Sequence, residues 1–99
     1  MESKLDYLSL SPPEYPKLAR AKGWEGTVLL KVLVDENGRP SGVWIEKSSG
    51  YPLLDFSAQK AVQKWKFYPA QHEHIPYACL TFVPVQFVLS ELDSPQSSY

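Results

Sequence analysis

Three stretches of the chain alternate apolar and polar side chains with the period of two that is typical of β-strands. The first, GTVLLKVLV at 26–34, has valine or leucine at every second position. Leu29 and Leu33 make its opposite face partly apolar as well, which indicates a central strand. The next four residues, Asp35-Glu36-Asn37-Gly38, are typical of a hairpin turn. We therefore expect the second strand to return antiparallel to the first.

The third alternating stretch, TFVPVQFVLS at 81–90, contains a proline within its strand pattern. Proline has no backbone N–H to donate, so within sheets it is confined to edges, bulges and first residues. The alternation continues through Pro84 without a break, which predicts an edge strand. Leu80 and Phe82 fall on the opposite parity from Val83, and a β-bulge near Thr81 is expected to restore the register.

Two segments carry helix signals. Pro16 and Gly23 mark the start and the end of a short helix. After Ser48-Ser49-Gly50 the apolar spacing changes from two to 3.6, which predicts a longer helix that ends at Pro69; its apolar face comprises Leu54, Ala58, Ala61, Val62 and Trp65. The polar segment QHEHI at 71–75 is expected to be a loop.

The order α-β-β-α-β predicts an α+β fold with a three-stranded antiparallel sheet of order 2-1-3 and both helices on one face. The opposite face, with Trp44, Leu29 and Leu33, is expected to be thinly covered. Residues 14–90 form the predicted domain. Segments 1–13 and 91–99 are polar or contain several Ser and Pro residues, and we expect both to be flexible.

Composition narrows the function classes only modestly. The 99 residues are 43% hydrophobic, and the net charge of −1 argues against nucleic acid as the main partner. Cys79 is the single cysteine, which excludes an internal disulfide. There is no run of about 18 apolar residues. A membrane anchor, if the protein has one, is therefore expected in a segment outside this chain.

The edge strand offers a site for another chain. If Pro84 directs its missing donor outward, Gln86 and Val88 direct their backbone groups outward too, whereas Val85, Phe87 and Leu89 pair inward. Such an edge can receive an extended peptide as an added strand. The alternative is that Pro84 only prevents unwanted pairing, and the pattern alone favours neither.

Other candidate chemistry is weaker. His72 and His74 lack a third metal ligand at a recognisable spacing. Cys79 as a nucleophile would need a base and an orienting group, and a small buried thiol is the expected role. We therefore expect no enzyme activity, no metal and no cofactor. A hydrolase or metalloprotein built on these three residues stays as the alternative.

Several short motifs resemble the C-terminal domain of TonB. The resemblance covers about Pro13 to Leu89, and the motifs match in order and spacing. They are Tyr15-Pro16, Gly23-Trp24-Glu25-Gly26-Thr27-Val28, Asn37-Gly38, Ser48-Ser49-Gly50, Leu54-Asp55, Ala61-Val62, Trp65-Lys66-Phe67, Pro69-Ala70 and Val83-Pro84-Val85 with Phe87.

The resemblance implies an energy transducer anchored in the inner membrane of a Gram-negative bacterium, with this domain in the periplasm. Its family works with a proton-driven motor of the ExbB and ExbD type. The family grips the TonB box, a short segment of outer-membrane transporters for siderophores, haem or cobalamin, as a strand beside the last strand. The implied partner-binding residues are Val83, Pro84, Val85, Gln86, Phe87, Val88 and Leu89.

Secondary partner contacts are expected from the segment before the first helix and from the bases on that helix: Pro13, Glu14, Lys17, Arg20 and Lys22. Some family members carry glutamine where Glu14 stands, so this sequence departs from the pattern there. A solvated helix face is the alternative for the bases. An edge that pairs with a second copy, giving a homodimer, or an adaptor domain without transporter specificity is the alternative function.

Overall fold

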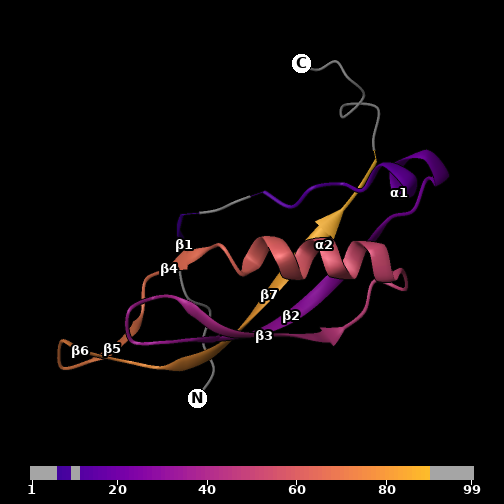
Figure 1. Cartoon of the computed structure of the whole chain (residues 1–99). Coiled ribbons are helices and arrows are strands. Elements are labelled where there is room, and N and C mark those ends of the chain that lie inside the picture. The colour runs from indigo at the N-terminus through magenta and orange to yellow at the C-terminus, as the bar shows by residue number, and fades with distance from the viewer. Residues whose placement is uncertain (1–6, 10–11, 90–99) are drawn as a thin grey trace.

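The sheet has three antiparallel strands with the first of them in the centre, as the sequence predicts. The computed structural model describes residues 7–9 and 12–89 (Figure 1). In it β2 (Gly26–Val34) lies between β3 (Pro40–Lys47) and β7 (Cys79–Phe87). The helix α2 (Pro52–Val62) crosses one face of this sheet, and α1 (Lys17–Lys22) sits near the end of β7. The predicted α+β fold is therefore confirmed.

Two small pairings complete the structure. The strand β1 (Tyr7–Ser9) pairs with β4 (Lys66–Phe67), and β5 (Ala70–His72) pairs with β6 (Ile75–Tyr77). The sequence analysis predicts none of these four strands. Segment 1–13, expected to be flexible, thus includes a short strand, whereas residues 91–99 lie outside the described part of the chain.

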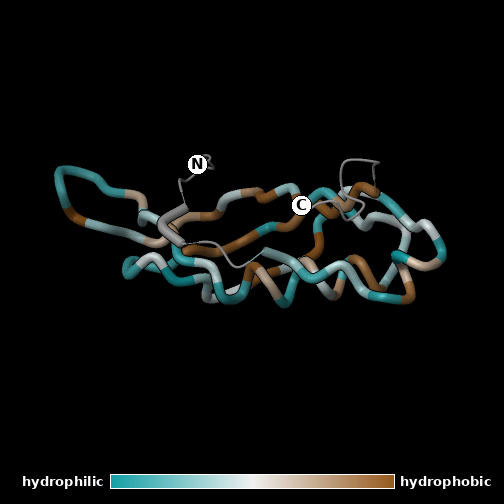
Figure 2. Tube along the Cα trace, turned by 90° about the horizontal axis from the view of Figure 1, so that it is seen from above, coloured by the Kyte–Doolittle hydropathy of each residue, from teal (hydrophilic) through white to brown (hydrophobic). Residues whose placement is uncertain are grey.

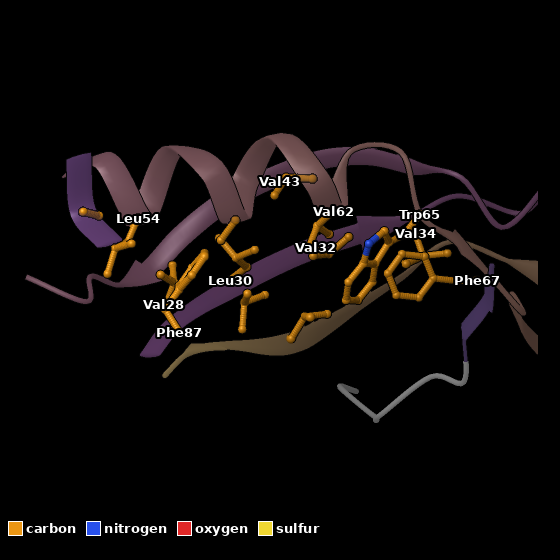
Figure 3. Close-up of a cluster of buried hydrophobic side chains, with 14 residues drawn as sticks. Val28, Leu30, Val32, Val34, Val43, Leu54, Val62, Trp65, Phe67 and Phe87 are labelled. Carbon is orange, nitrogen blue, oxygen red and sulfur yellow. The ribbon is translucent and has the colours of Figure 1, made fainter. Parts of the chain in front are cut away.

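The core fills the space between α2 and the sheet. Seen from above, the coil of α2 and the strands form two layers, and hydrophobic residues concentrate along the central strands (Figure 2). Leu54, Val28 and Phe87 meet at one end of the core, and Trp65, Val34 and Phe67 at the other (Figure 3). The helix α1 adds Ala19, which is fully buried. Burial of these side chains against one another is the main stabilising term.

The predicted turn between β2 and β3 is closed by Asp35. Its Oδ1 accepts hydrogen bonds from the backbone N–H groups of Asn37 and Arg39, both at 2.9 Å. Gly38 has a φ of 84°, which favours glycine, and its carbonyl accepts a 2.8 Å hydrogen bond from the Phe67 N–H. A Cβ on Gly38 would lie 2.2 Å from the Phe67 carbonyl oxygen. The turn is therefore packed directly against β4.

The connection from β3 to α2 is organised by a buried carboxylate. Asp55 is 7% exposed and accepts hydrogen bonds from the Ser48 hydroxyl, from the Ser49 N–H at 2.9 Å and from the Ser49 hydroxyl at 2.7 Å. Burial raises the pKa of Asp55, but the hydrogen bonds from Ser48 and Ser49 lower it by a larger amount. The pKa therefore lies below its ordinary value. The motif Ser48-Ser49-Gly50 thus fixes the entry to α2.

The helix α2 ends at Val62, so the prediction that it continues to Pro69 is wrong. The N–H groups of Lys64 and Trp65 bond to the carbonyls of Ala61 and Val62, both three residues earlier and both at 3.0 Å. This tight turn ends the helix, and the burial period changes to two, with Trp65 and Phe67 buried and Lys66 exposed. Trp65 therefore joins the core from outside the helix.

The expected loop 71–75 is a β-hairpin. Its turn residues Glu73 and His74 have φ values of 50° and 69°, the backbone that a two-residue hairpin turn requires. Neither is glycine or asparagine, so the sequence lacks the usual turn signal.

The expected bulge near Thr81 is also absent. The pairing of β2 with β7 has no register shift, and Leu80 and Phe82 lie on the face opposite the core.

The contact between Gly38 and Phe67 gives a test of the hairpin. We expect Gly38→Ala to lower the free energy of unfolding by well over about 1 kcal/mol, because it adds a clash with a backbone oxygen to the cost of a positive φ. Gly23→Ala is the matched control, since Gly23 has a φ of 73° and a Cβ added there would meet no atom within 4 Å. Urea unfolding of both variants measures the difference. Equal losses would show that the contact is unimportant.

The lowered pKa of Asp55 gives a pH-dependent test. An unfolded aspartate titrates near about pH 3.9, and the folded pKa is lower, so the stabilisation is complete above pH 3.9 and is lost as pH falls through the folded pKa. We expect Asp55→Asn to cost about 1–3 kcal/mol at pH 7 and progressively less below pH 4. Urea unfolding across this range measures it, with exposed Glu36→Gln as the control. A deficit that is constant with pH would contradict the assignment.

Candidate functional site

The strand β7 is an edge strand, as its proline predicts. It pairs with β2 in an uninterrupted antiparallel register from Val34 opposite Cys79 to Gly26 opposite Phe87, and Pro84 stands opposite Leu29. Over residues 7–9 and 12–89, no strand pairs with its other side. The outer edge of β7, meaning the backbone groups of 84–88 that point away from β2, is the candidate site.

The direction of the backbone groups follows from one hydrogen bond just beyond the strand. The N–H of Leu89 donates to the Glu25 carboxylate at 2.8 Å, and Glu25 directly precedes β2. Leu89 therefore directs its N–H toward the centre of the sheet. Since in-plane direction alternates along a strand, Val85 and Phe87 also point inward, whereas Pro84, Gln86 and Val88 point outward.

The predicted site residues divide into two groups by their side chains. Those of Val83, Val85 and Phe87 are 1%, 5% and 3% exposed and belong to the core. Pro84, Gln86 and Val88 are exposed, and Leu89 is partly exposed. A partner at this edge therefore meets the backbone groups of Gln86 and Val88, together with the side chains of the exposed group.

An aromatic contact joins the C-terminal end of β7 to the segment before α1. The ring of Tyr15 packs edge-on against Phe87, with ring centroids 5.3 Å apart, and the Tyr15 hydroxyl donates to the Trp24 carbonyl. The Arg20 guanidinium carbon lies 4.9 Å from the centroid of the Tyr15 ring. Of the predicted secondary contacts, Arg20 is therefore close to this end of the site.

The other predicted secondary contacts are less closely tied to β7. Lys17 and Lys22 are exposed on α1. Glu14 accepts a hydrogen bond at its backbone carbonyl from the Ser57 hydroxyl of α2, and Pro13 is partly exposed beside it. The backbone of Glu14 is thus attached to α2.

Sequence reasoning missed the role of Glu25. Its bond ties Leu89, two residues past the end of β7, to the residue that precedes β2. The two residues are 64 positions apart, and no local pattern predicts such a contact. The available signal is the register: once Gly26 is placed opposite Phe87, Glu25 has to lie near the residues that follow β7.

The residues considered for other chemistry lie away from this edge or inside the core. His72 and His74 are exposed at the β5–β6 turn, where His72 Nε2 lies 4.0 Å from a Glu73 carboxylate oxygen. Cys79 is 7% exposed. In the described ranges, no three His, Cys, Asp or Glu side chains are grouped as a metal site. No helix there is long and apolar enough to span a membrane.

The chain is similar to known proteins along most of its length. Residues 11–89 match the family model described as Gram-negative bacterial TonB protein C-terminal. Over 84 residues the chain is 46% identical to the protein tonB2 of Pseudomonas aeruginosa, covering 85% of this chain and 31% of that protein. The protein TonB of Vibrio cholerae is 38% identical over 77 residues, which cover 78% of this chain and 32% of that protein.

A solved structure shows the same fold. The solution NMR structure of the Pseudomonas aeruginosa TonB CTD matches with a TM-score of 0.74 at 26% identity, covering 90% of each chain. The chain spans only 31% and 32% of the two curated relatives, so the likeness concerns that part of their length. Because the family match and the fold agree, this chain belongs to the family of Gram-negative bacterial TonB C-terminal domains.

Proposed function

We propose that this domain grips an extended segment of a partner protein by adding it as a strand to the outer edge of β7. The observation that carries the proposal is the Glu25–Leu89 bond. Since backbone groups alternate along a strand, the inward N–H of Leu89 implies that those of Gln86 and Val88 point outward, as Pro84 does. These groups supply donors and acceptors to a fourth strand, and no described strand pairs with them.

The partner that fits the family is the TonB box of an outer-membrane transporter. In this role the domain works in the periplasm as the receptor-binding part of an energy transducer. A preceding region would anchor the protein in the inner membrane and connect it to a motor of the ExbB and ExbD type. The cargo would be siderophores, haem or cobalamin, and force from the proton gradient would act on the transporter through the added strand.

The energetics favour a grip that is modest on its own. About four backbone hydrogen bonds at roughly 0.5–1.5 kcal/mol each contribute about 2–6 kcal/mol. Ordering each residue of a flexible peptide costs about 1–2 kcal/mol. Further contacts must therefore contribute. The candidates are the exposed side chains of Pro84, Gln86 and Val88 on the edge and Arg20, which lies against the Tyr15 ring.

The alternative is that the same edge pairs with a second copy of this chain and forms a homodimer, or serves an adaptor without transporter specificity. The backbone groups of Gln86 and Val88 would serve either partner. Sedimentation over a range of concentrations, with and without a TonB-box peptide, separates the two. Dimers that dissociate when the peptide binds would indicate that both partners use one edge.

A proline at position 86 tests strand addition. We expect Gln86→Pro to fold, because the N–H that it removes points outward, and to weaken binding of a TonB-box peptide by about tenfold, the worth of roughly one buried hydrogen bond. Gln86→Ala is the matched control, since it keeps the N–H and loses only the side chain. Titration followed by the amide signals of Val85 to Leu89 measures both. Full binding by a folded Gln86→Pro variant would contradict the model.

The role of Glu25 can be tested separately. We expect Glu25→Ala to speed hydrogen exchange at the Leu89 amide and to weaken the same peptide about two- to tenfold, because the residues beyond β7 lose their alignment. Glu46→Ala, an exposed carboxylate on β3, is the control. An unchanged exchange rate at Leu89 would show that the bond does not order this segment.

A further inference from the structure

The face of the sheet opposite α2 carries a group of apolar side chains around one lysine. We call it the open face and define it by Leu29, Lys31, Leu33, Trp44, Leu80 and Phe82. Trp44 is 48% and Leu80 is 40% exposed, whereas the other four are partly buried. Exposed apolar side chains that gather in one patch are typical of a docking surface.

The strand register places these side chains next to one another. Lys31 stands opposite Trp44 on β3 and opposite Phe82 on β7. Leu33 stands opposite Leu80. Side chains of directly opposed residues on one face lie about 4.5–5.5 Å apart at their Cβ atoms. Lys31 is therefore at the centre of the open face, with aromatic rings on both sides.

The indole of Trp44 is held in place beside a hollow. A Cβ added to Gly42 would lie 2.4 Å from a carbon of this ring, so the ring lies over the glycine. The Lys31 Nζ is 5.9 Å from the ring centroid. The hollow has a volume of about 310 Å³ and is lined by Lys31, Leu33, Trp44 and Leu80. The hollow therefore offers apolar walls from Leu33, Trp44 and Leu80 beside the Lys31 side chain.

The charge of Lys31 decides which occupant fits. Among the residues that the structure describes, no carboxylate lies within 4.0 Å of it. A purely apolar partner would remove water from this charge without compensation, which is costly. Stacking the open face on a second copy would bring two lysines together. A partner that carries a carboxylate avoids both costs.

We propose that the open face binds an extended segment of another protein that presents an apolar side chain and, two positions away, an aspartate or glutamate. The apolar side chain fills the hollow between Trp44 and Leu80, and the carboxylate pairs with Lys31. Side chains two positions apart in an extended segment point to the same side, so both groups can meet the face together. The surface is separate from the outer edge of β7 and does not depend on strand addition there.

Two capped peptides test the proposal. The first is acetyl-Ala-Phe-Ala-Glu-Ala-amide, and the second has Gln in place of Glu. We expect amide and indole signals of Leu33, Trp44 and Leu80 to shift in a nuclear magnetic resonance titration, with the acidic peptide binding about two- to fivefold tighter. Lys31→Met should remove this difference, because it keeps an apolar stem and loses the charge.

Loss of the apolar contact should weaken both peptides. We expect Trp44→Ala to lower the affinity for each peptide by about tenfold or more. Leu80→Ser, at an exposed position, should also lower both affinities, because it removes an apolar side chain without adding a charge. The matched controls are Lys60→Met and Phe56→Ala, since Lys60 Nζ lies 5.7 Å from the Phe56 ring on the helix side. These controls should leave both affinities unchanged.

Three results would overturn the proposal. The first is binding that survives both Trp44→Ala and Leu80→Ser. The second is a set of shifts centred on Gln86 and Val88, which would assign the peptides to the edge of β7. The third is a concentration-dependent dimer that Trp44→Ala abolishes, because the occupant would then be a second copy. A Gln86→Pro variant that still binds these two peptides would support a separate surface, whether or not it has lost affinity for the TonB-box peptide.

Discussion

The missing N–H of Pro84 constrains both the direction of the β7 backbone groups and the choice of side chains that enter the core. Along a strand, the in-plane direction of the backbone groups and the face of the side chain both alternate with the same period. If the backbone nitrogen of Pro84 faces away from β2, the odd-numbered residues of β7 are the ones whose backbone groups form hydrogen bonds with β2. Their side chains are the ones that α2 covers, including Val83, Val85 and Phe87. One absent donor thus links the direction of the edge to the composition of the core.

Much of the architecture was predictable because its signals are local. The alternation in 26–34, the Asp35–Gly38 turn and the proline in β7 together indicated the sheet and its order. The end of α2 was not predictable, because Trp65 continues the helical spacing although a tight turn ends the helix at Val62. The same side chain satisfies both periods. The turn after Val62 and the burial of Phe67 distinguish them.

The remaining misses depend on contacts between distant parts of the chain or on unusual turn residues. The β5–β6 hairpin has Glu73 and His74 at positive φ, where sequence reasoning looks for glycine or asparagine. The bond from Leu89 to Glu25 links residues 64 positions apart. For the candidate site, the strand and its parity could therefore be predicted from the sequence, whereas the feature that orders its end required the three-dimensional register.

The edge-to-face contact of Tyr15 with Phe87 has a mechanical consequence. It joins the chain that precedes α1 directly to the end of β7. Tension applied through that part of the chain would load this pair of rings, the hydrogen bond from Ser57 to Glu14 and the covalent path through α1 into β2. The turn between β2 and β3 follows Val34 at the other end of β2 and lies far from this contact. Resistance to pulling would then depend first on the contacts at this corner of the sheet.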